Sequence, residues 1–281
     1  MLSYRHSFHA GNFADVLKHT VQILIIQALK QKPKPFVYFD THAGAGRYDL
    51  NTEMGQKKAE YKEGIEKIWQ LDDVPDLLFP YIEIIKQLNP DGKLTNYPGS
   101  PLISDMLMHR NNRLELSELH PADFTWLKQE FKEAKNINIK QQDGYKFLKS
   151  KLPPIQRRGL ILIDPPYELK TEYNDVISNI KQAYKLFATG IYTIWYPMVS
   201  RQNTEQFCKQ FKNSGIKNIL RIEMCVKADS EEYGMTGTGM IIINPPWKLA
   251  QQMEEILPWT VNKLKQDSNY NYIIETLVSE R

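Results

Sequence analysis

The chain has 281 residues, which is enough for one large domain or two small ones. Its hydrophobic content of 42% and charged content of 25% are ordinary for a globular protein, and no apolar run approaches the roughly 18 residues of a membrane span. The formal charge of +3 is too small to indicate nucleic-acid binding by itself.

Cysteine and histidine usage indicates neither a disulfide framework nor a metal site. Cys208 and Cys225 lack the C-x-x-C spacing of a zinc site. His6, His9 and His19 match no standard ligand pattern, so we predict no metal. Because the N-terminus also lacks the apolar run of a secretory signal, we predict a cytoplasmic monomer without membrane association.

Residues 1–35 are predicted to form a basic N-terminal segment and a helix that lies over the active site. From Asn12, apolar residues recur at steps of three and four until Pro33, which is helical spacing. The charged residues of this segment are Arg5, Lys18, Lys30, Lys32 and Lys34 against Asp15 alone.

A short buried strand is predicted over residues 36–40, and it is followed by a turn that contains Gly44 and Gly46. Such a turn is typical of nucleotide-type α/β folds, where glycines allow the backbone to approach a ligand and the terminal acid, Asp40, can bind a ligand amine. Asp49 stands where G-x-G-x-x-G has its third glycine. This departure disfavours NAD and favours the D-x-x-x-G-x-G form of S-adenosylmethionine enzymes.

Residues 47–98 do not show the helix and strand expected next. Residues 58–71 and 74–89 each have amphipathic helical spacing, so we predict a helical insertion subdomain. Ser100 then precedes another helix, where it is either an N-cap or a residue that faces the cofactor.

The second strand of the fold is predicted over residues 113–119, with Glu118 near its end. An acid at this place can accept both ribose hydroxyls of a nucleoside cofactor, usually about 20 residues after the glycine turn. Glu118 lies 72 positions after Gly46, and leaving out residues 47–98 reduces the gap to 20. The shortened gap supports both the insertion and the role of Glu118.

The third strand is predicted from residue 137 and ends at Asp143 and Gly144. Asp-Gly is a common turn pair that carries no function by itself. An acid at this strand end can also bond the amino group of a cofactor adenine, and we favour this interpretation.

The most informative stretch is an apolar strand, residues 160–163, that runs into Asp164, Pro165, Pro166 and Tyr167. Four large apolar residues indicate a strand buried on both faces, and the prolines hold Asp164 in a stiff extended turn. Asp164 and the Pro165 carbonyl can accept the two N–H bonds of an exocyclic amino group, while Tyr167 stacks on the ring. The tetrapeptide resembles the D/N-P-P-Y/F/W signature of methyltransferases that modify amino groups of bases or of glutamine.

The remaining strands complete the predicted fold. Residues 190–197 follow a helix over 172–187, and residues 219–226 and 237–243 form an antiparallel pair. Five parallel strands closed by a hairpin are the arrangement of class I S-adenosylmethionine-dependent methyltransferases, a Rossmann-like α/β fold. We therefore predict seven strands in a single domain, residues 1–281.

Asn244-Pro245-Pro246-Trp247 matches the same amino-group signature. Ligands of open α/β sheets bind at the carboxyl ends of the parallel strands. Residues 237–243 are predicted to run antiparallel to those strands, so Asn244 is expected at the opposite edge with a structural role. The loop over 227–236 is expected on the ligand side.

Several motifs together resemble one family, the RlmJ family of bacterial 23S ribosomal RNA adenine-N6 methyltransferases, over essentially the whole chain. These motifs are S-Y-R-H-S-F-H-A-G-N-F-A-D-V-L-K-H (3–19), D-T-H-A-G-A-G-R-Y (40–48), Y-P-G-S-P (97–101), E-L-H-P (118–121), D-G-Y (143–145) and I-D-P-P-Y-E (163–168). The resemblance implies Asp164 as the catalytic residue and Tyr4 as an RNA contact. It implies an S-adenosylmethionine pocket that uses His19, His42, Ser100, Glu118, Asp143, Gly144 and Asp164. To this pocket we add Lys18, Asp40 and Gly44, and to the substrate contacts we add Arg5, Pro165 and Tyr167.

The predicted function is methylation of N6 of a flipped-out adenine in 23S ribosomal RNA, with protein-free RNA or an early precursor as the partner. A DNA adenine methyltransferase would use the same tetrapeptide, but residues 47–98 look too small and insufficiently basic for a DNA-reading domain. Glutamine-N5 methylation favours Asn where this chain has Asp164. An RNA-binding protein without catalysis is disfavoured by the intact Glu118, Asp143 and glycine turn.

Overall fold

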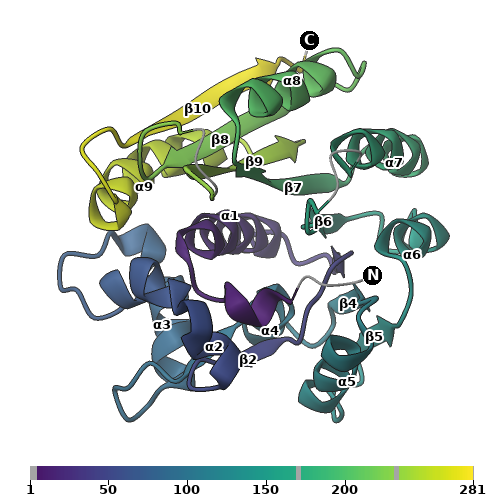
Figure 1. The fold of residues 1–281 in the computed structure, drawn as a ribbon. Coiled ribbons are helices and arrows are strands. Elements are labelled where there is room, and N and C mark those ends of the chain that lie inside the picture. The colour runs from purple at the N-terminus through teal and green to yellow at the C-terminus, as the bar shows by residue number, and fades with distance from the viewer. Residues whose placement is uncertain (1–4, 169–171, 231–233, 281) are drawn as a thin grey trace.

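The computed structural model describes residues 5–168, 172–230 and 234–280, and a large sheet lies at its centre (Figure 1). Its strands are β1 (Val37–Asp40), β4 (Arg113–Ser117), β5 (Ile137–Lys140), β6 (Gly159–Ile163), β7 (Ile191–Met198), β8 (Ile219–Cys225), β9 (Gly237–Ile243) and β10 (Asn271–Val278). In the order β5-β4-β1-β6-β7 they run parallel, and β9 lies antiparallel between β7 and β8. The predicted class I methyltransferase fold is confirmed.

The described part of the sheet has one strand more than the seven predicted. β10 pairs antiparallel with β8 and forms an edge of the sheet. Leu277 is the one buried residue of this strand. An edge strand of this kind does not need the continuous apolar run that marks the central strands, so the sequence did not indicate it.

Helices cover both faces of the sheet, as Figure 1 shows. They are α1 (Phe13–Lys30), α4 (Ser100–Leu107), α5 (Pro121–Glu130), α6 (Gly144–Lys151), α7 (Glu172–Leu186), α8 (Arg201–Lys212) and α9 (Leu249–Leu264). Alternate residues of β6 belong to two separate cores: Leu160 and Leu162 to the core that includes α1, α4 and α9, and Ile161 and Ile163 to the core that includes α6, α7 and α8.

Helix α1 is buried on almost every side. Asn12 caps its N-terminus by accepting a hydrogen bond from the Asp15 amide, and 15 of its 18 residues are buried. Figure 1 shows α1 between the strands that end the chain and the helices of residues 47–98. Polar residues on such a helix, including Lys18 and His19, must find partners inside the protein.

Residues 47–98 begin and end in a short antiparallel ribbon that the sequence did not predict. Strand β2 (Arg47–Asp49) pairs with β3 (Asn96–Pro98). Between them lie α2 (Glu53–Lys58), α3 (Phe79–Leu88) and the 3-10 turns η2 (Glu60–Glu63), η3 (Ile65–Lys67) and η4 (Asp76–Leu78).

The prediction of an amphipathic helix over residues 58–71 is wrong. Ala59 has a left-handed backbone with φ 48°, which ends α2, and Gly64 has φ −131° and ψ −114°, outside the helical region. A Cβ at Gly64 would lie 2.1 Å from the carbonyl oxygen of Gly11, so this glycine allows the insertion to contact the N-terminal segment. The second predicted helix is present as η4 and α3.

Candidate functional site

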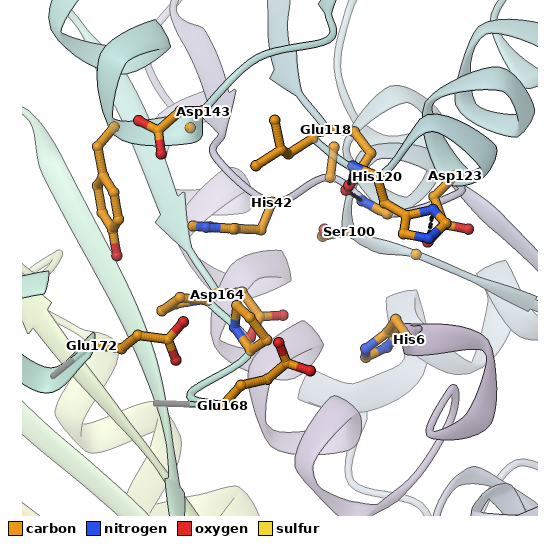
Figure 2. Close-up of a pocket in the computed structure, with 18 of the residues that line it drawn as sticks. His6, His42, Ser100, Glu118, His120, Asp123, Asp143, Asp164, Glu168 and Glu172 are labelled. Carbon is orange, nitrogen blue, oxygen red and sulfur yellow. Dashed lines mark hydrogen bonds and ion pairs between the residues drawn. The ribbon is translucent and has the colours of Figure 1, made fainter. Parts of the chain in front are cut away.

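A cleft of about 490 Å³ opens at the carboxyl ends of β1, β4, β5 and β6. Figure 2 shows side chains from these strand ends and from the N-terminal segment around one space. Ten of the residues predicted for the site line this cleft: Lys18, His19, His42, Gly44, Ser100, Glu118, Asp143, Gly144, Asp164 and Pro165. The fold thereby brings Lys18 into contact with Asp164, which lies 146 positions later in the sequence.

Glu118 holds the glycine turn that follows β1. Its Oε2 accepts a hydrogen bond from the Gly44 amide at 2.7 Å, and its Oε1 accepts one from the His120 amide at 2.7 Å. Burial raises the pKa of the Glu118 carboxyl. Gly44 has φ +62°, and a Cβ there would lie 2.1 Å from the Tyr48 hydroxyl, so only glycine fits. Each carboxylate oxygen keeps a lone pair for a ligand hydroxyl.

Asp40 lies beneath the cleft rather than in its wall, which corrects the prediction of a direct ligand contact. It accepts hydrogen bonds from the Ser100 hydroxyl at 2.6 Å, the Tyr38 hydroxyl at 2.7 Å and the His42 amide at 3.2 Å. Burial raises the pKa of its carboxyl. Ser100 does line the cleft, but the N-cap of α4 is Gly99, so the capping interpretation of Ser100 is wrong.

The turn after β5 combines a structural role with a place in the cleft wall. Asp143 caps α6, because its Oδ1 accepts a hydrogen bond from the Lys146 amide at 2.8 Å. A Cβ at Gly144 would lie 2.1 Å from the carbonyl oxygen of Thr41, so glycine lets the two turns approach. Burial lowers the pKa of His42 to about 4, which keeps its imidazole neutral near pH 7.

Asp164 makes an ion pair with Lys18. The Lys18 ammonium donates to Asp164 Oδ2 at 2.6 Å and to Asp15 Oδ1 at 2.7 Å. Burial opposes the charge on Lys18, yet the two carboxylates raise its pKa above the usual range. Asp164 Oδ1 receives no hydrogen bond from the described residues, so it can accept one from a ligand.

His19 presents a buried, unused nitrogen to the cleft. Its Nδ1 is 2.7 Å from the Tyr97 hydroxyl, which in turn is 2.6 Å from the Tyr81 hydroxyl. Its Nε2 is buried and has no hydrogen-bond partner among the described residues. Burial lowers the pKa of His19 to about 3, so the ring is neutral. A buried nitrogen without a partner is a position for a ligand.

Tyr167 does not line the cleft. Its hydroxyl donates to the Trp195 carbonyl at 2.7 Å, and its ring lies 4.6 Å from the Tyr173 ring. Its φ of 51° turns the backbone away from the strand after Pro166. Stacking of Tyr167 on a base stays a prediction, and it requires this ring to leave its hydrogen bond with Trp195.

The N-terminal segment reaches the opposite wall of the cleft. Tyr4 lies outside the described residues. Arg5 pairs with Asp123 at 2.9 Å, so it contacts α5 rather than the cleft space. His6 lines the cleft with its Nε2 2.9 Å from Asp15 Oδ2.

Several cleft residues were missed by sequence reasoning. They include His6, His120, Asp123, Tyr145, Glu168, Glu172 and Asp175. Glu168, Glu172 and Asp175 lie within eleven positions after Asp164, so their closeness in the sequence to the Asp-Pro-Pro-Tyr stretch could have indicated them. In the described ranges, no group of three or more His, Cys, Asp or Glu side chains could hold a metal ion. Those ranges also contain no helix with the length and apolar character needed to cross a bilayer.

Comparisons with known proteins give a consistent result. The family model described as ribosomal RNA large subunit methyltransferase D, RlmJ, matches residues 33–275. Ribosomal RNA large subunit methyltransferase J of Escherichia coli (strain K12) is 54% identical over 280 residues, and its counterpart in Haemophilus influenzae is 49% identical over 281, each covering 100% of both chains. The crystal structure of protein LPL1258 from Legionella pneumophila has a TM-score of 0.89 and 39% identity, covering 95% of this chain and 98% of that one.

Proposed function

The chain belongs to the RlmJ family of ribosomal RNA large subunit methyltransferases, and from this premise we propose that it methylates N6 of a flipped-out adenine in 23S ribosomal RNA, using S-adenosylmethionine. The single observation that carries the adenine assignment is the corner at Asp164 and Pro165. Asp164 and Pro165 both line the cleft, as does Gly44 of the glycine turn after β1, and the Asp164 carboxylate and the Pro165 carbonyl are the two acceptors that we assign to the amino group.

The described residues fit S-adenosylmethionine. Gly44 and Gly144 keep side chains away from two strand ends, and the buried His19 Nε2 lacks a partner. Glu118 would accept the ribose hydroxyls, and Asp143 would accept the adenine amino group. When bound, S-adenosylmethionine supplies an electrophilic methyl group on a positively charged sulfur.

The protein must make a poor nucleophile react, because the lone pair of an adenine amino nitrogen is delocalised into the ring. Asp164 Oδ1 and the Pro165 carbonyl would each accept one amino N–H. These hydrogen bonds favour a pyramidal nitrogen, whose lone pair is no longer delocalised into the ring and can attack the methyl group. Positioning of this kind supplies a large share of the acceleration.

Lys18 would set the charge of the site. Its ammonium donates to Asp164 Oδ2, which fixes the orientation of the carboxylate and leaves Oδ1 for the amino group. As the new N–C bond forms, positive charge develops on the amino nitrogen, and the carboxylate stabilises it. The amino proton becomes acidic at that stage, so Asp164 can accept it without being a strong base beforehand.

Methyl transfer from labelled S-adenosylmethionine tests this proposal. The acceptors are protein-free 23S ribosomal RNA, assembled large subunits, adenine-containing DNA and protein. We expect label in the protein-free RNA, recovered after digestion as N6-methyladenosine. Label in DNA alone would support the DNA adenine methyltransferase, and binding of RNA without any transfer would support a binding protein that lost catalysis.

Substitution of Glu118 by glutamine is expected to weaken S-adenosylmethionine binding by roughly 10- to 100-fold. The amide offers one acceptor oxygen to two backbone N–H donors, and a hydrogen bond to a charged group is worth about 1.5–3 kcal/mol. Calorimetric titration measures the effect. Glu115→Gln is the matched control, because Glu115 lies on β4, three residues before Glu118, but bonds Asn138 and Lys151. Equal affinities of the two variants would contradict the role of Glu118.

A further inference from the structure

The edge of the sheet opposite the cleft has an unusual charge pattern. We call it the amino edge, and define it by the loops at residues 31–36, 109–113 and 152–158, which enter the adjacent strands β1, β4 and β6, together with residues 244–248 after β9. The four loops contain no Asp or Glu. Their basic residues are Lys32, Lys34, Arg110, Arg113, Arg157, Arg158 and Lys248. The chain as a whole carries 36 basic and 33 acidic residues, so the imbalance is local.

The basic side chains of the amino edge are available to a partner. Lys32, Lys34 and Arg157 are exposed, and no basic residue of this edge makes an ion pair with a described residue. Elsewhere in the described ranges, lysines and arginines such as Arg47, Lys151 and Arg201 pair with carboxylates. Lys32, Lys34 and Arg157 therefore carry exposed positive charge that no ion pair with a described carboxylate neutralises.

The loops of this edge are held in place. The Arg158 guanidinium donates to the Leu29 carbonyl at 2.8 Å and to the Lys34 carbonyl, which ties the loop before β1 to the loop before β6. The strands that follow are in register, with Val37 opposite Arg113 and Gly159. Loops whose backbone is held in this way lose little backbone entropy when their side chains bind a partner.

An exposed aromatic ring accompanies these charges. Trp247 is 82% exposed, with the Lys248 ammonium 4.8 Å from its ring centre. Asn244 places this loop at the start of β7, because its side-chain amide donates to the carbonyls of Ala188 and Gly190 at 2.8 Å each. This contact gives Asn-Pro-Pro-Trp, the second match to the amino-group signature, its structural role. It also leaves the ring free to stack on an unpaired base.

We propose that the amino edge is a second RNA-binding surface, which contacts phosphates of the large-subunit RNA away from the adenine in the cleft. The inference rests on the proposed function. From β4 to β9 the edge extends over about 20 Å, and along β6 it lies about 20 Å from Asp164. A short RNA held in the cleft would not reach it, whereas a folded RNA with a neighbouring helix would.

The test compares Lys34→Gln/Arg157→Gln with the control Lys181→Gln/Lys209→Gln, which removes the same charge from exposed positions of α7 and α8. RNA binding is measured by filter retention at several salt concentrations, with 23S ribosomal RNA and with a short hairpin that carries the adenine identified by the labelling experiment. For the long RNA we expect about tenfold weaker binding and a salt slope smaller by about 1.5, because two phosphate contacts are lost. Hairpin binding and kcat on the hairpin should not change. Trp247→Ala should weaken long-RNA binding about threefold with an unchanged salt slope.

Three outcomes would overturn the proposal. The edge variant could match the control on the long RNA, or it could lose hairpin binding equally, which would place the effect in the cleft or the fold. The same variants are also tested on protein-containing large subunits. A loss of binding to these subunits without a loss of binding to the free RNA would indicate a protein partner instead. Because binding is measured without methyl transfer, a failure of the proposed methylation is distinguishable from a failure of this surface.

Discussion

Replacement of Asp164 by alanine is expected to abolish methyl transfer while S-adenosylmethionine binding largely survives. The variant removes the acceptor for one amino proton and the negative charge beside the reacting nitrogen. Groups that accept a proton in the transition state contribute about 10²–10⁴-fold, and charge stabilisation adds to this. We therefore expect a decrease in kcat of at least about 10³-fold, measured in single turnovers with saturating cofactor and RNA.

The asparagine variant separates charge from shape at the same position. Asp164→Asn keeps an acceptor oxygen and the size of the side chain, but leaves the Lys18 ammonium with Asp15 as its one remaining carboxylate. Activity should fall nearly as far as in the alanine variant. Cofactor affinity within about fivefold of wild type would show that the fold is intact. Turnover within tenfold of wild type in either variant would remove Asp164 from the centre of the mechanism.

The second large effect is expected for Lys18→Met, with a decrease in kcat of about 10²–10³-fold near pH 7. Methionine fills a similar space without charge, so the buried Asp15 and the partly buried Asp164 then face each other without the ammonium between them. Burial works against the ionised Asp15, and His6 and Lys18 are what bring the pKa of its carboxyl well below the usual range. Loss of the ammonium favours protonation of Asp15, and a protonated Asp15 beside Asp164 would weaken the acceptor.

The sign of the pH dependence follows from this loss. In the variant a higher pH is needed to keep Asp15 ionised, so the acid limb of the kcat profile should move to higher pH and activity should partly recover as the pH rises. Lys18→Arg, which keeps the charge, should retain more activity than Lys18→Met. Lys30→Met, at the other end of α1, is the control. A uniformly reduced profile with no shift would show that Lys18 acts by packing and not by charge.

The strand ends of the site were predictable because spacing along the chain reports them. Gly44, Glu118, Asp143 and Asp164 each follow a predicted strand, and parallel strands bring their carboxyl ends to one edge. All four line the cleft. The recurring strand-then-acid pattern therefore carried most of the information about the cleft.

Contacts made by α1 were not predictable in the same way. Lys18 and Asp164 are 146 positions apart, and their pairing depends on the rotation of a helix that is buried on almost every side. The polar residues Asp15, Lys18, His19 and Gln22 of α1 recur at helical spacing, but this spacing does not show which part of the fold the polar stripe contacts. The ribbon of β2 and β3 escaped prediction because strands of three residues are too short to show alternation.

The chain of hydroxyls that runs from Tyr81 through Tyr97 to His19 has a consequence for protein engineering. The insertion supplies both tyrosines, so it forms part of the support under a nitrogen of the cleft. Residues 50–95 therefore cannot be replaced without regard to these contacts. A chimera that takes this segment from a distant relative would have to preserve a phenol at the position of Tyr81. Deletion of the segment would expose the buried imidazole of His19 to water.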